Sequence, residues 1–385
     1  MAGVVPSYLG ALIRVSNLAN RRKALMTTAQ YLNARFKDQR LKALLASQWG
    51  CYGLPPGRSA FAAHAMAAVM NYSTGGYYPE GGAGRLAEHI APAVEKAGGR
   101  FLLKSEVTGI IVENGRAAGV RVKAASGGAG GTAEFRAPVV ISDAGAFNTY
   151  LKLLPKDVDI PFRDEISGFR HGASAVVLYA ALRKSPVDLG FKGGNCWIYE
   201  GFDHDRAYEE NGPLLLEGRP SYCFVSLQSL RDPAATEHLV EVVSFCDYGL
   251  FDKWKDQPWL KRDKEYYGLK DRISDGLIAL VEKHFRGFKD RIEYRELSTP
   301  LTMEYFTAKP RGEFYGIALT PERFTRKWCG VRTPVENLYL TGSDAFAIGI
   351  NGAMFAGVAA AGVATGPFGF FKVIRDIMGR PTPQE

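Results

Sequence analysis

The fold of this chain of 385 residues is indicated most clearly by the stretch Pro334-Val335-Glu336-Asn337-Leu338-Tyr339-Leu340-Thr341-Gly342-Ser343-Asp344. Its apolar residues Leu338-Tyr339-Leu340 predict a short strand that ends in a glycine-containing turn. The stretch Gly349-Ile350-Asn351-Gly352-Ala353 then opens a helix of small residues that runs to Ala364. A strand, a turn and a small-residue helix are therefore expected in direct succession.

Such a helix start offers unpaired backbone N–H groups and a partial positive charge, which suit a flavin ring edge or a pyrophosphate. Small residues also allow a ligand to approach the backbone. Tight packing of strand, turn and helix without a ligand explains the same pattern, because small-residue helices are also a packing device. Periodicity alone does not separate these two interpretations.

Composition indicates a globular chain that can bury a sizeable core in two or three domains, with 46% hydrophobic and 23% charged residues. The net charge of +8 is modest, and no nucleic-acid motif accompanies it, so no nucleic-acid partner is expected. Basic residues nevertheless crowd the first stretch, where we expect solvated helix faces and keep a membrane-surface contact as the alternative. They are Arg14, Arg21, Arg22, Lys23, Arg35, Lys37, Arg40 and Lys42.

The five cysteines are widely spaced and form no Cys-x-x-Cys pair, so neither a disulfide framework nor a zinc site is indicated. A reducing cytoplasm fits this pattern best. The apolar start Met1–Leu12 carries no early positive side chain and makes a poor secretory signal. The run Gly352–Ala364 is shorter than the roughly 18 residues expected of a membrane-spanning helix. We expect a cytoplasmic protein, with peripheral membrane contact as the alternative location.

Along the chain, apolar spacing predicts several helices between Leu9 and Met70, and a further helix over Arg85–Lys96. A long amphipathic helix is expected over Lys264–His284. Runs of β-branched and aromatic residues predict the strands. These are Phe101–Val107, Ile110–Val112, Ala118–Lys123, Phe135–Ser142, Ser174–Leu182, Tyr222–Leu227 and Val240–Cys246.

The stretch Pro334–Asp344 with Gly349–Gly357 resembles the C-terminal flavin-binding signature of the phytoene desaturase, carotenoid isomerase and retinol saturase group. The resemblance implies FAD as the cofactor, with the acidic residue Asp344 close to its ribityl and phosphate part. It also implies that the helix from Gly349 is aimed at the flavin. The candidate cofactor residues are Gly342, Ser343, Asp344, Gly349, Ile350, Asn351, Gly352 and Ala353.

Two further stretches carry the resemblance. Tyr78-Pro79-Glu80-Gly81-Gly82 and the run to Val120 resemble the group's central segment, which implies that the backbone of Val107 meets the adenosine half of FAD. Ser298–Gly316 resembles a substrate-domain segment that runs near the flavin face in relatives. We therefore expect Tyr305 and Tyr315 to line the substrate pocket, although a half-buried structural tyrosine explains either residue as well.

The resemblance implies an α/β fold in which a discontinuous, partial FAD-binding domain is interrupted by a mixed-sheet substrate domain with a helical layer. The helical segment 1–74 is assigned to the substrate domain, 75–145 to the FAD-binding domain, 146–330 to the substrate domain and 331–385 to the FAD-binding domain. Relatives begin with a strand, a Gly-x-Gly-x-x-Gly turn and a helix. We find no such unit before Tyr31, so three explanations stay open: a truncated sequence, a degenerate copy, or a split protein whose partner chain supplies this dinucleotide-binding unit.

The activity implied by the resemblance is an FAD-dependent oxidoreduction at carbon–carbon bonds of an apolar polyene or retinoid, by desaturation, saturation or isomerisation. No catalytic side chain is assigned, because the flavin carries the chemistry. The alternative is a non-catalytic remnant or subunit that binds FAD only with a partner chain. A nicotinamide enzyme that uses Gly82–Ala87 with Glu106 is a third interpretation, weakened by the absence of a strand before Gly82.

No hydrolase elbow or metalloprotease motif is present in the sequence. The triplet Asp203-His204-Asp205 has metal-ligating residue types, but a solvated loop is the favoured interpretation because charged residues surround it. We therefore expect no metal site.

Overall fold

The computed structural model describes residues 20–73, 75–123 and 131–379. These residues pack as two compact units, each built from separate parts of the chain. The first unit contains Leu102–His171 and the chain from Tyr315 onward, and the second contains Met26–Phe101 and Gly172–Phe314. The chain thus leaves the first unit after His171 and returns to it at Tyr315.

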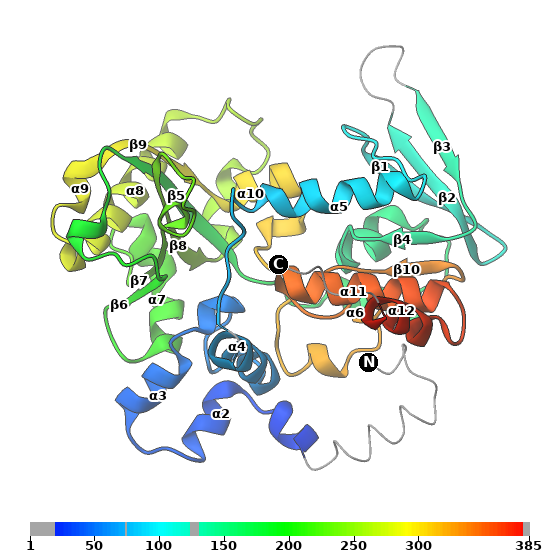
Figure 1. The fold of residues 1–385 in the computed structure, drawn as a ribbon, viewed down its shortest axis with the longest axis horizontal. Helices are drawn as coiled ribbons and strands as arrows, with labels where there is room; N and C mark the ends of the chain where they lie inside the picture. The colour runs from blue at the N-terminus through cyan, green and yellow to red at the C-terminus, as the bar shows by residue number, and fades with distance from the viewer. Residues whose placement is uncertain (1–19, 74, 124–130, 380–385) are drawn as a thin grey trace. The chain divides into compact units, whose positions relative to one another are not determined.

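The first unit is organised around two small sheets (Figure 1). Strands β1 (Val107–Glu113), β2 (Arg116–Lys123) and β3 (Thr132–Arg136) form an antiparallel sheet in that order. Strands β4 (Val140–Ser142) and β10 (Leu338–Leu340) pair in parallel. Its helices are η2 (Asn148–Leu153), α6 (Arg163–Ser167), η7 (Arg323–Thr325), α11 (Gly349–Ala364) and α12 (Gly369–Met378).

The core of the first unit lies where α11 packs beside the β4–β10 pair. Ala356, Ala359 and Ala360 on α11 are buried, as are Leu338 and Leu340 of β10. Small side chains let the helix approach closely, and at Gly362 an added Cβ would lie 2.6 Å from the Cα of Phe370 at the start of α12. The expected strand, turn and small-residue helix are therefore confirmed.

The second unit has a five-stranded sheet in the order β6-β7-β8-β5-β9. All of its strand pairs are antiparallel, whereas the sequence analysis expects a mixed sheet. The side-chain pattern reports which face of a strand is buried but not the direction of its neighbour, which explains the difference. The strands are β5 (Ser174–Leu182), β6 (Cys196–Tyr199), β7 (Tyr222–Ser226), β8 (His238–Cys246) and β9 (Ile292–Ser298).

Helix α8 (Lys264–His284) matches the expected amphipathic helix and buries Leu269, Ile273 and Leu277 in the core of the second unit. Gly276 lets the turn at Gly218 approach, since a Cβ there would lie 2.2 Å from the Gly218 carbonyl oxygen. The other helices are α2 (Thr28–Asn33), α3 (Gln39–Ala46), η1 (Trp49–Cys51), α4 (Phe61–Ser73), α5 (Gly84–Lys96), η3 (Val187–Leu189), α7 (His204–Leu216), η4 (Gln228–Leu230), η5 (Tyr248–Trp254), α9 (Phe288–Arg291), α10 (Pro300–Thr307) and η6 (Pro310–Gly312).

The α/β class is confirmed, and three details differ from the sequence expectations. Residues 101–106 form no strand, and β1 begins only at Val107. The expected strand Phe135–Ser142 is split into β3 and β4, because Pro138 lacks the N–H that a continuous ladder needs. The expected segment 75–145 is divided between the units, with α5 in the second. The role of the segment 75–145 in cofactor binding stays a prediction.

Some expectations fall outside the described residues. They concern the apolar start Met1–Leu12, Arg14 and the beginning of the helical pattern at Leu9. In the described part of the chain, no helix has both the length and the apolar character that crossing a bilayer requires.

Candidate cofactor site

The carboxyl ends of β4 and β10 meet at one edge of their parallel pair. The Thr341 N–H, just after β10, donates to the Ser142 carbonyl at the end of β4, at 2.9 Å. Gly342 follows with φ 76°, and a Cβ there would lie 1.7 Å from an Asp143 carboxylate oxygen. In open α/β sheets, ligands bind outside the carboxyl ends of parallel strands, so this edge is the first place to look for a site.

Asp344 joins the loops at this edge through its buried carboxylate, which is only 4% exposed. Its Oδ2 accepts the backbone N–H of Ala146 at 2.9 Å, and its Oδ1 accepts that of Ile317 at 3.0 Å. Asp344 therefore connects three segments: the turn after β4, the turn after β10 and the segment at Ile317. Each of its carboxylate oxygens can still accept one more hydrogen bond.

Two glycines make room for the Asp344 carboxylate. A Cβ at Gly316 would lie 2.4 Å from Oδ1, and a Cβ at Gly145 would lie 2.9 Å from Oδ2. Both glycines also have left-handed backbones, with φ 83° and 82°. A side chain at either position would be both strained and crowded.

Arg323 stabilises the same turn with its buried guanidinium, which is 3% exposed. Its Nη1 donates to the Ile317 carbonyl at 2.5 Å, and its Nη2 donates to the Ser343 carbonyl at 2.6 Å. Hydrogen bonds from a charged donor are among the stronger ones in proteins. The conformation of residues 343–344 is thus fixed from both sides.

Helix α11 begins a few residues after Asp344, and its first helical turn is exposed to solvent. Gly349, Ile350 and Asn351 are exposed, and no side chain caps the helix at Ile348. Gly349 has φ 77°, and a Cβ there would meet nothing within 4 Å. The first N–H groups of this helix are therefore available to an electronegative ligand edge. Gly352 is different, since a Cβ there would lie 2.1 Å from the Ala347 carbonyl oxygen.

Val107 lies at the start of β1, an edge strand of the three-stranded sheet in the same unit. It pairs with Val122, and the flanking Lys123 N–H donates to the Glu106 carbonyl at 2.8 Å. Because backbone groups alternate in direction along a strand, the N–H and C=O of Val107 face away from β2. Its backbone is thus oriented for the expected contact, while its role stays a prediction.

The two candidate pocket tyrosines lie in different units. Tyr305 on α10 belongs to the second unit, is 58% exposed and stacks on Trp259 with ring centroids 4.9 Å apart. Tyr315 begins the returning segment of the first unit and is half-buried. Each tyrosine therefore stays a separate candidate for contact with the substrate.

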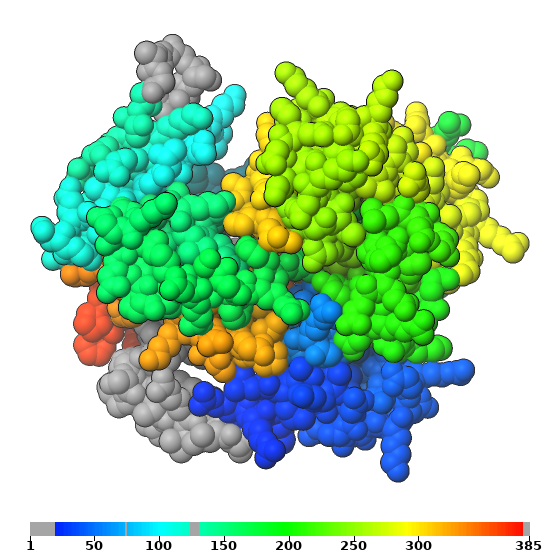
Figure 2. All heavy atoms as spheres, turned by 180° about the vertical axis from the view of Figure 1, so that it is seen from behind, coloured from blue at the N-terminus to red at the C-terminus, as the bar shows by residue number. Residues whose placement is uncertain are grey.

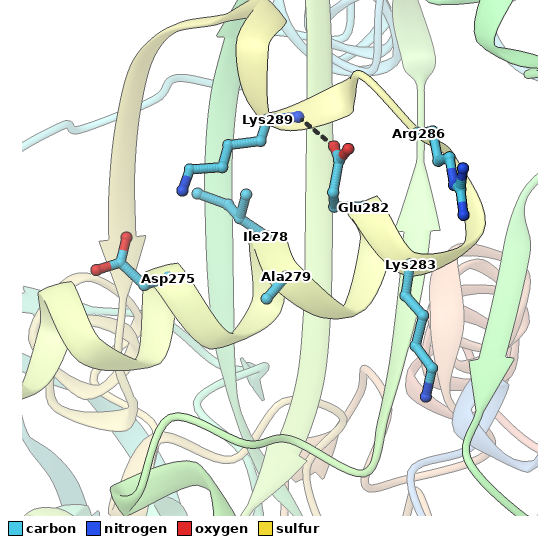
Figure 3. Close-up of a pocket in the computed structure, with 7 residues that line it drawn as sticks. All are labelled: Asp275, Ile278, Ala279, Glu282, Lys283, Arg286 and Lys289. Atoms are coloured by element: carbon cyan, nitrogen blue, oxygen red, sulfur yellow. Dashed lines mark hydrogen bonds between the residues drawn. The ribbon is translucent and has the colours of Figure 1, made fainter.

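A separate surface hollow lies on α8 and α9 and contains none of the predicted site residues. Its charged side chains point in different directions, and the Glu282 carboxylate accepts the Lys289 backbone N–H at 2.8 Å (Figure 3). Another hollow, lined in part by Pro138 and Asn337, lies at the amino ends of β4 and β10, away from Asp344. Neither hollow gathers groups that converge on a ligand.

The triplet Asp203-His204-Asp205 is not the solvated loop that the sequence analysis favours, since it begins α7. Asp203 caps the helix, the buried His204 Nε2 lies 2.9 Å from the Ala43 carbonyl oxygen, and Asp205 accepts the Gly57 N–H at 2.7 Å. The three side chains therefore make hydrogen bonds to three different backbone segments and do not converge on a common point.

The nicotinamide interpretation also lacks its structural context. No strand precedes α5, because residues 75–83 form loops and turns. Glu106 belongs to the first unit, whereas Gly82–Ala87 belong to the second. A dinucleotide fingerprint requires a strand that leads directly into the glycine turn.

Comparison with known proteins identifies the class. A family model described as flavin containing amine oxidoreductase matches residues 20–240, and the chain belongs to this family. The family identifies the cofactor class as a flavin.

Individual relatives are consistent with the narrower group. All-trans-retinol 13,14-reductase of Danio rerio is 32% identical over 369 residues, covering 91% of this chain and 60% of that protein. Prolycopene isomerase 2 of an Oncidium hybrid is 28% identical over 306 residues, covering 77% of this chain and 47% of that protein. The predicted resemblance is therefore confirmed, and the chain spans about 60% of the length of the retinol reductase.

Among solved structures, cyclohexylamine oxidase from Brevibacterium oxydans aligns with a TM-score of 0.56 at 15% identity, covering 97% of this chain and 76% of that one. At this identity the likeness concerns the fold. It supports the expected discontinuous α/β architecture.

Gly145, Gly316 and Arg323 surround Asp344 in the structure but are not among the residues predicted from the sequence. Gly145 could have been predicted from the sequence, because it closely follows the strand Val140–Ser142. In a parallel pair, the loop after this strand must lie beside the loop after Leu338–Leu340. Arg323 carried no such signal, since a single arginine in a loop has no distinguishing pattern.

Proposed function

We propose that this chain is an FAD-dependent oxidoreductase that acts on carbon–carbon bonds of an apolar polyene or retinoid. The structural observation that supports FAD binding is the pair of hydrogen bonds that the Asp344 carboxylate accepts from the backbone N–H groups of Ala146 and Ile317. We call this pair of hydrogen bonds the clamp. This clamp fixes the turn that leads to the open start of α11. The similarity to a retinol reductase and a carotenoid isomerase supports the substrate class.

The donor set fits FAD. Gly342, Ser343 and Asp344 would meet the ribityl and phosphate part, the backbone of Val107 the adenosine half, and residues 349–353 the flavin. A bound flavin supplies hydride transfer, while the chain binds, orients and shields the reacting parts from water. The fit is favourable because the open N–H groups of α11 suit the electronegative edge of a ligand.

Tyr305 and Tyr315 stay the candidate contacts of the apolar substrate, each considered within its own unit. Their rings offer an apolar surface with a polar end, which suits a long apolar molecule with one hydroxyl group. Relatives named for retinol and prolycopene support this substrate class. The cytoplasmic location and a peripheral membrane contact stay predictions from the sequence.

A partner chain that supplies a dinucleotide-binding unit belongs to the same proposal. Among the described residues β4 pairs with β10 alone, and Ile141 in β4 is 46% exposed. Parallel sheets are normally larger and covered on both faces, so this edge suits a further strand. The alternative function is a non-catalytic subunit that binds FAD only with its partner. The same strand edge supports this alternative.

The test is an anaerobic turnover assay with the purified chain and FAD. With the chemically reduced flavin we add all-trans-retinol and follow flavin reoxidation, because saturation of a double bond takes up two electrons. With the oxidised flavin we add phytoene and follow flavin reduction, because desaturation releases two electrons. The polyene absorbance is recorded in both cases. Coupled changes, absent with the Asp344→Ala variant, are expected. Retained flavin with no change in any polyene would favour the non-catalytic subunit.

A further inference from the structure

A group of largely exposed apolar side chains in the second unit includes Tyr305, a pocket candidate, together with three residues that have no role in the site described above. It consists of Trp259 and Leu260 from the loop between η5 and α8, and of Tyr305 and Phe306 from α10. Leu260 is 69% exposed, Tyr305 58% and Phe306 68%. We call these four residues the aromatic patch. Figure 2 shows the yellow-green segment around residue 255 beside the yellow-orange segment that includes α10.

The rings of the patch support one another. Trp259 stacks on Tyr305 with an interplanar angle of 11° and meets the Phe306 ring edge-on, with centroids 5.1 Å apart. Tyr305 and Phe306 are also edge-on, with centroids 5.0 Å apart. The Arg262 guanidinium lies 5.8 Å from the Trp259 ring centroid. The patch is therefore an ordered surface rather than a set of independent side chains.

Leu260 occupies a backbone conformation that leucine normally avoids. Lys261 N donates to the Pro258 carbonyl at 3.0 Å, which closes a tight turn, and Leu260 within it has φ 61°. Glycine or asparagine is preferred at such a position. An exposed leucine gains nothing from this conformation within the described chain, and strain of this kind tends to be kept at binding sites.

The base of the loop is held rigidly. The Asp263 carboxylate accepts the Trp254 indole N–H at 3.0 Å, the Gln257 amide at 2.9 Å and the Tyr266 N–H at 2.9 Å. The Asp263 N–H in turn donates to Gln257 Oε1 at 3.0 Å. Because the loop is held at both ends, little ordering entropy is lost when its tip is buried.

Basic side chains outnumber acidic ones along this loop. Lys253 pairs with Glu265, whereas Lys255, Lys261 and Lys264 form no ion pair within the described part of the chain. The acidic residues are Asp252, Asp256, Asp263 and Glu265, of which Asp263 is occupied by its three hydrogen bonds and Glu265 by Lys253. The stretch from Asp252 to Glu265 thus has five basic and four acidic residues, and its three unpaired lysines are available to an anionic surface.

We propose that the aromatic patch docks onto the headgroup region of a lipid bilayer, with Leu260 and Phe306 inserted and the lysines against anionic headgroups. Tryptophan and tyrosine prefer the membrane interface, because their rings are apolar and carry one polar group. Lysines near an anionic surface add electrostatic attraction. The choice of a bilayer over a protein partner rests on the proposed apolar substrate, which dissolves in membranes.

The test measures binding of the full chain to vesicles of phosphatidylcholine, alone or with about one third phosphatidylserine. The wild-type chain should bind both, and the mixed vesicles more tightly. Leu260→Gly should weaken binding about ten-fold, since it removes one inserted side chain. Glycine is favoured at φ 61°, so a loss of folding cannot explain this result. Lys261→Glu should weaken binding only to the mixed vesicles.

The matched control is Leu103→Gly, which removes a loop leucine that is 83% exposed outside the patch. A second readout is quenching of tryptophan fluorescence by brominated lipids, which Trp259→Phe should abolish while binding persists. Absence of binding to either vesicle, or equal binding by wild type and Leu260→Gly, would overturn the proposal. Flavin retention is measured on the same samples, so that failure of the proposed function is seen separately.

Discussion

The Asp344 carboxylate accepts the Ile317 N–H at 3.0 Å, although the two residues lie 27 positions apart in the chain. Together with the bond to Ala146, this contact joins segments that the second unit separates in the sequence. The acidic residue that the resemblance assigns to cofactor binding is therefore also the structural centre of its unit. Stability and cofactor affinity should respond together when this centre is disturbed.

Replacing Gly316 by alanine should destabilise the chain strongly. The new Cβ would lie 2.4 Å from Asp344 Oδ1 on a backbone with φ 83°. We expect a loss of about 3 kcal/mol in the free energy of unfolding, measured with urea. Gly115→Ala is the matched control, because φ is 77° there and a Cβ would meet nothing within 4 Å. It should cost only about 1 kcal/mol, and equal losses would contradict the clamp.

Asp344→Asn tests the hydrogen bonds themselves. The amide has one oxygen and one NH₂ group, so it can accept only one of the two backbone N–H groups that Asp344 binds. A buried donor left without an acceptor should cost about 1–3 kcal/mol. Thermal unfolding of the flavin-free protein measures this loss. Ser343→Ala, next to it in the same turn, should have a much smaller effect on the unfolding temperature.

Asn351→Asp should change stability and flavin affinity in opposite directions. A carboxylate in the first turn of α11 interacts favourably with the helix dipole and should stabilise the flavin-free chain by about 0.3–1 kcal/mol. The same negative charge would repel the phosphates and electronegative edge of FAD. Urea unfolding and FAD titration of one preparation measure both effects. Unchanged FAD affinity would place the cofactor away from the start of α11.

Stability should fall as the pH falls below 6.5, the ordinary pKa of histidine. Burial lowers the pKa of His64 and of His204 from that value, so the unfolded chain takes up protons that the folded chain resists. His204 also sits at the start of α7, where a positive charge is unfavourable. Urea midpoints at about pH 8 and about pH 5 measure the slope.

His204→Gln should reduce this pH dependence, because glutamine does not titrate and can still donate to the Ala43 carbonyl. The matched control is His89→Gln, the same replacement at an exposed histidine on α5. An equal slope in the wild type and His204→Gln would show that other groups determine the acid sensitivity.

Much of the architecture could be predicted, because its signals are local. The periodicity over Lys264–His284 and the run Leu338–Leu340 depend only on neighbouring residues, and both elements are where we expect them. The direction of the strands in the second unit and the break at Pro138 were missed. The first depends on partners distant in sequence, and the second on one missing backbone donor.

The candidate site was predicted in its linear part alone. Asp344 and Gly349–Ala353 are assigned through the resemblance, which rests on residues that follow one another along the chain, and their contact with a cofactor stays a prediction. Gly145, Gly316 and Arg323 join them only through folding, and their requirement is steric or depends on carbonyl positions. A single sequence contains no local pattern for such contacts.

The most direct test of the central claim is a titration of the purified, flavin-free chain with FAD, followed by its visible spectrum and gel filtration. We predict saturable, stoichiometric binding with the bands of a bound flavin, and marked weakening by Asp344→Asn and Asn351→Asp. Stoichiometric binding that neither substitution affects would contradict the proposed site. No retained flavin, even with excess FAD, would contradict binding by this chain alone and leave the partner-dependent subunit as its function.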